Sequence, residues 1–550
     1  MKRHRMLIMF FILIISLSFG CEKMNSEEPA RKDRKTEAEI VPERGGYIVN
    51  AITRDAIILN PLFINDVSSM EIGAKLFEGL VRYDRDLNLV GVLAQSWEVI
   101  DQGLEIIFHL KKNVKWHDGN MFTAYDVKFT YDTIMKFRNF NESGVKSQLW
   151  TMFDYVKDVN VLDDHTVKVS YKYPYARTIE IWQTGILPKH IFGKYDSLKK
   201  IAESEFNWEP VGTGKYRMSK WIPDERIILE VNPDYHGMVP YIEKLIFTIK
   251  PDQDIIYLDT RLGKNDITEL TSTQFGNLTG DSEFSKKIMP FRFTGNHYMF
   301  LAYNLDNPKF ENPEVRRALT LAINREEIIE GVLEGYGRIA HGPFYEYSWA
   351  FNNDVKPLPY DPERASEMLR EAGWYDSDGD GIIDRNGEQF VFTVLVDGSK
   401  HKRNMALKFI KRNLAEIGVT LNIEKVSWDS LIRDHIYPKQ FEAFLAGWEL
   451  GKDPDIFSIW HKDGPLNFIS YNNETVNELL EKGRRTFDRN IRRQNYHEVH
   501  RLIMEDMPYT FLYIDDILGA VNRRIKGVEV FPNGLSEFTQ WYVKYRTVIH

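Results

Sequence analysis

Cysteine is almost absent from this sequence: Cys21 is the only one among 550 residues. No disulfide can therefore form within the chain, and no metal site can be built from several cysteines. After the first twenty residues, no apolar run approaches the about 20 residues that a membrane-spanning helix needs. Positive charge is not in excess either, because 71 Lys and Arg stand against 80 Asp and Glu, a formal charge of −9. That surplus of acid argues against binding to a nucleic acid backbone, so we expect no nucleic acid partner.

The sequence also lacks the motifs of common enzymes. Residues 212–215 (GTGK) resemble a phosphate-binding loop, but Glu209 replaces the first glycine and Tyr216 replaces the serine or threonine. His497 and His500 are three residues apart, whereas a zinc-protease helix spaces them by four, and we expect both to face solvent. No Gly-x-Ser-x-Gly nucleophile turn occurs. We therefore expect that the protein is not an enzyme.

The N-terminus has the pattern of a secretion signal. Basic residues within the first five positions precede an apolar run from Met6 to Phe19, which is too short to span a bilayer. Gly20 then precedes Cys21, as in bacterial lipoprotein signals. We predict a signal peptide over residues 1–20 and lipidation of Cys21, with palmitate among the acyl chains. The alternative is an ordinary signal peptide followed by an incidental cysteine.

Downstream of the cysteine, the chain changes from a charged segment to a folded body. Residues 22–44 have few large apolar side chains and cannot bury enough surface to offset the entropy of ordering, so we predict a lipid-anchored flexible tether over residues 21–44. From Gly45 onward, strand and helix patterns alternate, which predicts a mixed α/β fold. The predicted elements are 47–49, 105–110, 123–137, 159–162, 166–171, 313–333, 361–373, 404–417, 419–426, 473–483 and 492–507.

One acidic segment has the spacing of a calcium loop. Oxygen ligands are expected at loop positions 1, 3, 5 and 9, with glycine at the sharp turn. The residues at those four positions are Asp376, Asp378, Asp380 and Asp384. The glutamate expected at position 12 is missing, because Gly387 stands there and Glu388 follows it. The sequence leaves a calcium site and a bare acidic turn both open, and no other cofactor is expected.

The most distinctive pattern of the chain lies in residues 93–132. Its marked positions are Ala94, Trp97, Gly103, Phe108, Leu110, Val114, Trp116, His117, Asp118, Gly119, Phe122, Thr123, Ala124, Asp126 and Val127. This pattern resembles the signature of the family 5 extracellular solute-binding proteins, the peptide- and nickel-binding components of ABC importers. Further matches run along nearly the whole mature chain, and the Gly212-Thr213-Gly214 turn is one of them.

The resemblance implies an architecture. It is the two-lobed periplasmic-binding-protein fold of type II, in its large form with an extra domain. Lobe I would take residues 45–75, 206–292 and 518–550, the extra domain residues 76–205, and lobe II residues 293–517. The ligand would lie between the lobes, with hinge motion about crossover strands near 290–300 and 510–525.

The resemblance also implies where a ligand would bind. Peptide binders of this family hold the ligand's amino group with an aspartate shortly after a Gly-Trp pair. In this chain the pair is Gly447-Trp448, but Gly451 stands where the aspartate is expected. Either Glu449 substitutes for it, or the ligand has no α-amine. The candidate ligand-binding residues are Trp448, Glu449, Tyr303, Asn304 and Asn467.

The function implied by the resemblance is that of a transport receptor. It would be a monomer in the cell envelope, held on the membrane by its lipid and facing the periplasm or the exterior. It would capture a small solute and deliver it to the permease and ATPase subunits of an ABC importer. We expect a peptide as the solute. The alternatives are a sensor or scaffold lipoprotein of the same fold, and a binder of a metal chelate or a sugar.

Overall fold

The computed structural model describes residues 38–139 and 149–549, and residues 42–545 form one compact unit. The predicted signal peptide, Cys21 and most of the predicted tether lie outside the described residues. The end of the tether prediction is wrong, because β1 (Ala38–Glu43) is a strand that pairs with β24 (Lys544–Ile549). Composition could not reveal this pairing, since the partner strand lies at the other end of the chain.

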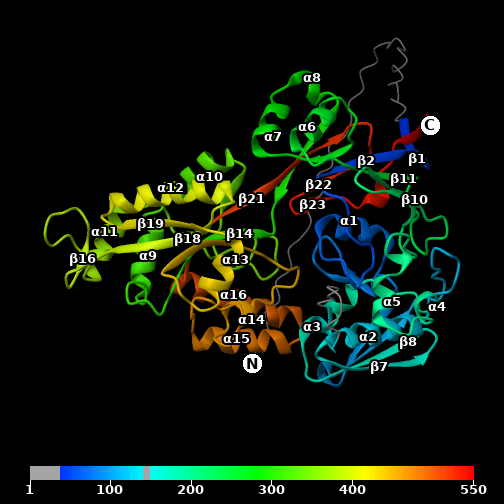
Figure 1. Cartoon of the computed structure of the whole chain (residues 1–550), viewed down its shortest axis with the longest axis horizontal. Coiled ribbons are helices and arrows are strands. Elements are labelled where there is room, and N and C mark those ends of the chain that lie inside the picture. The colour runs from blue at the N-terminus through cyan, green and yellow to red at the C-terminus, as the bar shows by residue number, and fades with distance from the viewer. Residues whose placement is uncertain (1–37, 140–148, 550) are drawn as a thin grey trace, which may run out of the picture. The chain divides into compact units, whose positions relative to one another are not determined.

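One long strand, β21 (Tyr509–Asn522), connects two groups of strands in the central sheet (Figure 1). The order is β19-β18-β20-β14-β21-β12-β2-β11-β10-β9, and β13 and β15 also pair with β21. The first group is β2 (Tyr47–Ile52), β9 (Tyr216–Ile222), β10 (Arg226–Val231), β11 (Lys244–Ile249), β12 (Ile267–Glu269) and β13 (Ile288–Thr294). The second group is β14 (His297–Tyr303), β15 (Gly337–Ile339), β18 (Val391–Asp397), β19 (Thr420–Val426) and β20 (Ala443–Glu449).

The chain passes between the two groups at two neighbouring points. β13 pairs with the second half of β21 as far as Thr294 opposite Asp516, whereas β14 pairs with the first half from Met299 opposite Tyr513. We call the segment between these pairs the crossover. The predicted lobe boundaries at 292/293 and 517/518 fall within two residues of the ends of the β13 pairing.

Residues 76–205 add a four-stranded antiparallel sheet in the order β5-β6-β8-β7. Its strands are β5 (Ala94–Ile100), β6 (Glu105–Leu110), β7 (Val156–Asp163) and β8 (Thr166–Tyr171), beside the small pair β3 (Val81–Tyr83) and β4 (Leu89–Gly91). The predicted strand 105–110 and the predicted 159–171 hairpin are confirmed. Phe108 and Val169 of this sheet belong to the same buried cluster as Ile48 and Leu245 of the central sheet. The predicted extra domain therefore shares its hydrophobic core with the first group of strands.

Most helices begin at a residue whose side chain caps them. Those before β13 are α1 (Val67–Leu76), α2 (Ala124–Lys136), α3 (Leu149–Phe153), α4 (Lys189–Phe192), α5 (Leu198–Ala202), α6 (Gln253–Arg261), α7 (Ser272–Thr279) and α8 (Ser282–Ser285). Those after it are α9 (Pro313–Leu321), α10 (Arg325–Leu333), α11 (Pro362–Glu371), α12 (His401–Glu416), α13 (Trp428–Ser430), α14 (Phe457–Trp460), α15 (Glu474–Arg485) and α16 (Arg489–Asp506). The predicted helix 313–333 is wrong as one element: the Asn324 side chain accepts the Glu327 N–H at 3.0 Å and starts a second helix.

One histidine is placed differently from its prediction. His500 of α16 is fully buried, although we expected it to face solvent. Its Nε2 donates to the His341 carbonyl at 2.7 Å, and its Nδ1 accepts the Asn352 N–H at 3.1 Å. Burial lowers the pKa of His500 to about 4. The ring is therefore a neutral structural group at neutral pH.

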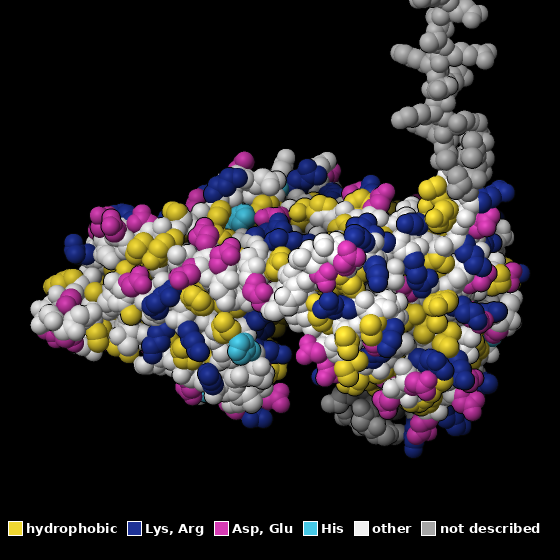
Figure 2. Space-filling model, turned by 90° about the horizontal axis from the view of Figure 1, so that it is seen from above, with side chains coloured by type: hydrophobic (Ala, Val, Ile, Leu, Met, Phe, Trp, Pro, Cys, Tyr) yellow, Lys and Arg dark blue, Asp and Glu magenta, His cyan; other side chains and the backbone are white. Residues whose placement is uncertain are grey.

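The surface has no dominant charge on the face seen in Figure 2. Lys and Arg side chains are interspersed there with Asp and Glu, and hydrophobic side chains lie in small groups between them. This mixture gives that face no basic patch of the kind that binds nucleic acid. Among the described residues, no helix has both the length and the apolar character needed to cross a membrane.

Candidate functional site

In both groups, the parallel strands have their carboxyl ends at the crossover. β12 pairs antiparallel with β21, with Glu269 opposite Gly519, so its carboxyl end lies nearest the crossover, and β2 and β11 run in the same direction. In the second group, Glu449 at the carboxyl end of β20 lies opposite His297 at the start of β14, and β18 runs parallel to β20. Ligands of open α/β sheets bind outside the carboxyl ends of the strands. The crossover is therefore the candidate binding site.

A cavity of about 840 Å³ lies at this edge of the first group of strands. It is lined by the end of β2 and the loop after it, the first turns of α1, β12 and β13. The rings of Phe291 and Phe293, two residues apart on β13, stack with centroids 5.8 Å apart and 15° between their planes. This volume lies in the range of about 300–1,000 Å³ that ligand pockets occupy. We call it the crossover cavity.

Two predicted ligand-binding residues lie at the same edge in the second group of strands. Trp448 is half-buried and nearly parallel to the rings of Phe300 and Phe468, with centroids 6.0 and 6.3 Å away. Glu449 is exposed, and the ring of its register partner His297 is bonded to Asp515 at the crossover. Both residues are placed where a ligand at the crossover could reach them, and their contact with a ligand stays a prediction.

Three other predicted ligand-binding residues lie elsewhere. Tyr303 is at the far end of β14, fully buried, with its hydroxyl 2.8 Å from the Thr510 hydroxyl. Asn304 donates to a backbone carbonyl at 3.0 Å, and the buried Asn467 donates to two carbonyls at 2.7 and 3.1 Å. The chain itself satisfies these polar groups, which gives each of them a structural role, and their contact with a ligand stays a prediction.

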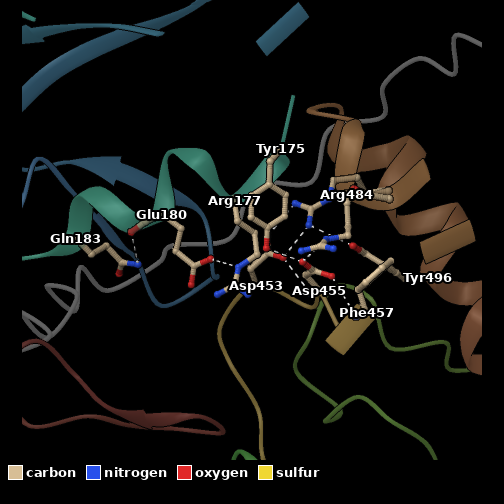
Figure 3. A network of polar contacts seen from close by, with 11 residues as sticks. Tyr175, Arg177, Glu180, Gln183, Asp453, Asp455, Phe457, Arg484 and Tyr496 are labelled. Atoms are coloured by element: carbon tan, nitrogen blue, oxygen red, sulfur yellow. Dashed lines mark hydrogen bonds and ion pairs between the residues drawn. The ribbon is translucent and has the colours of Figure 1, made fainter. Parts of the chain in front are cut away.

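The segment after Trp448 is held by ion pairs (Figure 3). Asp453 accepts hydrogen bonds from both terminal nitrogens of Arg492 at 2.7 and 2.8 Å, and each side chain is 8% exposed. Asp455 accepts the Tyr175 hydroxyl at 2.7 Å and Arg484 Nε at 3.1 Å, a contact between residues 76–205 and the second half of the chain. Both carboxylates already have cationic partners, so neither replaces the missing amine-binding aspartate.

The position of that missing aspartate offers no carboxylate. Gly451 is exposed, and the Nζ of the next residue, Lys452, lies 5.8 Å from the centre of the Tyr83 ring. In the second half of the chain, Glu449 therefore stays the predicted carboxylate for a ligand's amine.

The acidic loop brings together three of its four predicted calcium ligands. Asp376, Asp378 and Asp380 are exposed and place one carboxylate oxygen each within 4.8 Å of the others. Asp384 is not in this group, because Ser377 donates to it from both its backbone N–H, at 3.0 Å, and its hydroxyl, at 2.6 Å. Three clustered carboxylates suit a hard cation such as Ca²⁺. Calcium binding by this loop stays a prediction.

The signature segment proves to be structural. His117 Nδ1 accepts the Gly212 N–H at 3.1 Å, and Nε2 donates to the Gly214 carbonyl at 3.1 Å. Trp116 is 2% exposed, and Asp126 closes the capping box of α2 by accepting the Thr123 N–H at 2.8 Å. None of the described residues 93–132 lines the crossover cavity. The segment that carries the family resemblance therefore holds the Gly212-Thr213-Gly214 turn in place.

These features define a class of protein: a two-lobed α/β protein of the periplasmic-binding-protein type, with a candidate ligand site at the crossover. The sequence profile of the bacterial extracellular solute-binding proteins, family 5, matches residues 88–467, and the chain belongs to this family. The predicted family and the predicted type II fold are both confirmed.

Relatives cover almost the whole chain. It is 29% identical to the oligopeptide-binding protein AppA of Bacillus subtilis over 99% of this chain and 100% of that protein. It is 26% identical to the dipeptide-binding protein of Escherichia coli, over 81% and 84% of the two chains. The structure of AppA in complex with a nonapeptide superposes with a TM-score of 0.69 over 92% of this chain and all of that one. NikZ of Campylobacter jejuni in complex with Ni(L-His), 26% identical, superposes with a TM-score of 0.70 over 90% of this chain and 99% of that one.

Proposed function

We propose that this protein captures a peptide at the crossover and delivers it to the permease and ATPase subunits of an ABC importer, without catalysing a reaction. The observation that carries the proposal is the crossover cavity, which lies at the carboxyl ends of β2 and β12; β20 of the second group also ends at the crossover. The peptide assignment is supported by AppA and the dipeptide-binding protein, which cover most of the chain. Phe291, Phe293 and Trp448 would supply apolar walls for side chains, and water would bridge to the peptide backbone.

The direct test is to identify what the protein carries. Ligand released by denaturing the purified protein would be analysed by mass spectrometry, and peptides of two to nine residues would be titrated by calorimetry. We expect peptides in the released fraction and saturable binding of at least one length class. A non-peptide ligand in the released fraction, with no peptide binding, would contradict the assignment.

A metal chelate is the second candidate, because the structure of NikZ with Ni(L-His) superposes over 90% of this chain. Calorimetry with nickel and L-histidine together, against each alone, decides this case. The sensor and scaffold alternatives require a different measurement. Uptake of a radiolabelled peptide by cells with and without the protein would separate an import receptor, whose loss abolishes uptake, from a sensor, whose loss leaves uptake unchanged.

We propose that the two groups of strands belong to separate lobes that close over the ligand about the crossover, with lobes I and II and the extra domain as predicted. The support is the change of strand partner along β21 at the crossover. Ligand closure should lower the radius of gyration measured by small-angle X-ray scattering. An unchanged scattering curve at saturating ligand would contradict it.

We also propose that Cys21 carries the membrane anchor, on the strength of the sequence pattern alone. Two or more acyl chains are needed for stable anchoring, because one chain binds only marginally. Cys21→Ala should move the protein from the membrane fraction to the soluble fraction of the cell envelope. If the variant stays in the membrane fraction, the anchor lies elsewhere.

A further inference from the structure

The crossover cavity is unusual in its charge. Its lining carries four carboxylates, from Asp55, Asp66, Glu71 and Glu269, and one cationic side chain, Arg54. The remaining lining residues are apolar or neutral, and they include the stacked pair Phe291 and Phe293. A partly enclosed cavity with this balance favours a cation, and an aromatic face adds to that preference.

Two of the four carboxylates have structural roles. Asp55 accepts the Ala56 N–H at 2.8 Å on one oxygen, and the Trp221 indole and the Asp224 N–H on the other. Asp66 caps α1 by accepting the Ser69 N–H at 2.9 Å on one oxygen, while its other oxygen is buried without a hydrogen-bond partner. Because these two groups build the loop and the helix start, their variants would also disturb the fold.

The other two carboxylates have unused acceptor capacity. Glu71 accepts from Asn50 Nδ2 at 2.7 Å on one oxygen, which fixes its orientation on the second turn of α1. Among the described residues, the Glu269 side chain at the end of β12 has no hydrogen-bond or ion-pair partner. Burial raises the pKa of Glu71, with Lys75 opposing this and the charge of Glu269 adding to it. Burial also raises the pKa of Glu269, although part of this residue is exposed to solvent. The two carboxylates therefore lie close enough for each to act on the charge of the other.

Lys75 is the cation that acts on Glu71, and it opposes the effect of burial on that carboxylate. Lys75 and Glu71 both line a smaller adjoining cavity, and the Nζ of Lys75 lies 5.3 Å from the centre of the Phe538 ring. Burial lowers the pKa of the Lys75 ammonium. One lysine beside two carboxylates leaves the charge of Glu71 and Glu269 only partly compensated.

We propose that Glu71 and Glu269 hold a cationic group of the bound solute, an ammonium or guanidinium, in the crossover cavity. This inference rests on the proposed peptide-binding function and specifies it: the preferred peptides carry positive charge at the position that enters the cavity. The charge could come from a lysine or arginine side chain or from the terminal amine. In either case recognition lies in the first half of the chain, away from the Gly451 position where the family's aspartate is missing.

The probes are alanine pentapeptides carrying one lysine at each position in turn, each matched by a norleucine peptide of the same shape without the charge. A second set has an acetylated N-terminus. Calorimetry would measure each peptide against the wild type and against Glu71→Gln, Glu269→Gln and the double variant. Glu225→Gln, an exposed carboxylate outside the cavity, is the control, and Glu449→Gln tests the competing amine site.

We expect at least one lysine peptide to bind about tenfold to a hundredfold more tightly than its norleucine match, as for a hydrogen-bonded charge. If the cation is the terminal amine, acetylation causes the loss instead. In either case the discrimination should shrink in each single variant and disappear in the double variant, while Glu225→Gln keeps it. Glu269→Gln removes no internal bond, so it stays informative if Glu71→Gln unfolds.

Three outcomes would overturn the proposal, and they differ from one another. Peptides that bind without charge discrimination refute the cation site but leave the peptide function standing. Discrimination that survives the double variant and is lost in Glu449→Gln moves the cation to the second half of the chain. If the wild type binds no peptide at all, the proposed function itself fails, and this inference fails with it.

Discussion

Both sides of the crossover are rich in acid, but the two sides differ in how that acid is paired. In the second half of the chain, Asp453 and Asp455 are paired with Arg492 and Arg484, and Asp515 with His297. In the first half, Glu269 has no partner among the described residues, and Glu71 has only an amide. Residue type therefore does not distinguish a structural carboxylate from a ligand-binding one. The distinguishing property is whether the fold supplies the counter-charge, and this can be tested on both sides.

The largest expected effect comes from removing a counter-charge on the paired side. Arg492→Met leaves Asp453 buried and unpaired, which should lower the free energy of unfolding by about 3–5 kcal/mol. Chemical denaturation of the variant measures this loss. Adding Asp453→Asn should restore much of the stability, because the uncompensated charge is then gone. Arg501→Met is the control on the same helix: its ion pairs with Glu498 and Glu505 are 43–49% exposed, so it should cost about 0–1 kcal/mol.

A second prediction concerns a property that the two halves share, a histidine whose pKa is lowered by the fold. Burial lowers the pKa of His500 to about 4, while the unfolded chain takes up that proton near pH 6.5. Stability should therefore fall as the pH drops from about 6.5 to 4, by about 3 kcal/mol for His500, and change no further below that through this group. His117, whose pKa burial also lowers to about 4, adds a loss of the same sign.

Non-titrating variants test that pH dependence. His500→Gln and His117→Gln should each flatten the decline of unfolding free energy between pH 6.5 and 4, whatever their effect at pH 7. His401→Gln, at an exposed position, should leave the slope unchanged. If the wild type and the three variants all have the same slope, neither the His500 ring nor the His117 ring is the source of the acid sensitivity.

The third prediction examines the aromatic wall on the paired side. Trp448→Ala should weaken ligand binding at least tenfold, since truncating an aromatic hot spot costs about 2 kcal/mol. Calorimetry with a peptide that binds the wild type gives the ratio, and matched melting curves verify folding. If the folded variant keeps wild-type affinity, Trp448 belongs with Phe300 and Phe468 as packing.

The smallest expected effect is that of calcium on the acidic loop of Asp376, Asp378 and Asp380. Calcium at ten times its dissociation constant would stabilise the folded protein by about 1.4 kcal/mol. The melting temperature should therefore rise by about 1–3 °C relative to a chelator at fixed pH and ionic strength, depending on how much of the chain melts with the loop. Asp378→Asn should reduce the rise. Identical melting curves with calcium and chelator would favour the bare acidic turn.

The sequence predicted the fold better than the site, for a physical reason. Capping and turn signals are local: Thr123 and Asp126 form the expected capping box, and Pro313 begins α9 as expected. The break at Asn324 escaped prediction because the apolar spacing continues through it. Glu71 and Glu269 escaped because they carry no motif and meet only when β12 pairs beside β2. Ligands of open α/β sheets bind outside the carboxyl ends of the strands, but this generalisation could have located Glu71 and Glu269 only after the strand order was known.

The signature segment shows why a family pattern does not identify the ligand. Its residues match the family pattern because they hold a turn and a helix start, as His117 and Asp126 do. Such roles are the same whatever the ligand is, so the pattern reveals the family and not the solute. The candidate contacts Tyr303 and Asn467 show a related limit: a family position identifies a place in the fold, but not which polar groups the chain itself will satisfy there.

The continuous core between residues 76–205 and the first group of strands has a consequence for cooperativity. Side chains such as Phe108 and Val169 bury their surface in the same cluster as Ile48, so neither part can lose its packing alone. In calorimetry the first half of the chain should melt as one transition that includes residues 76–205. The extra domain is thus an extension of one folding unit, and a fragment that contains only residues 76–205 would expose half of a shared core.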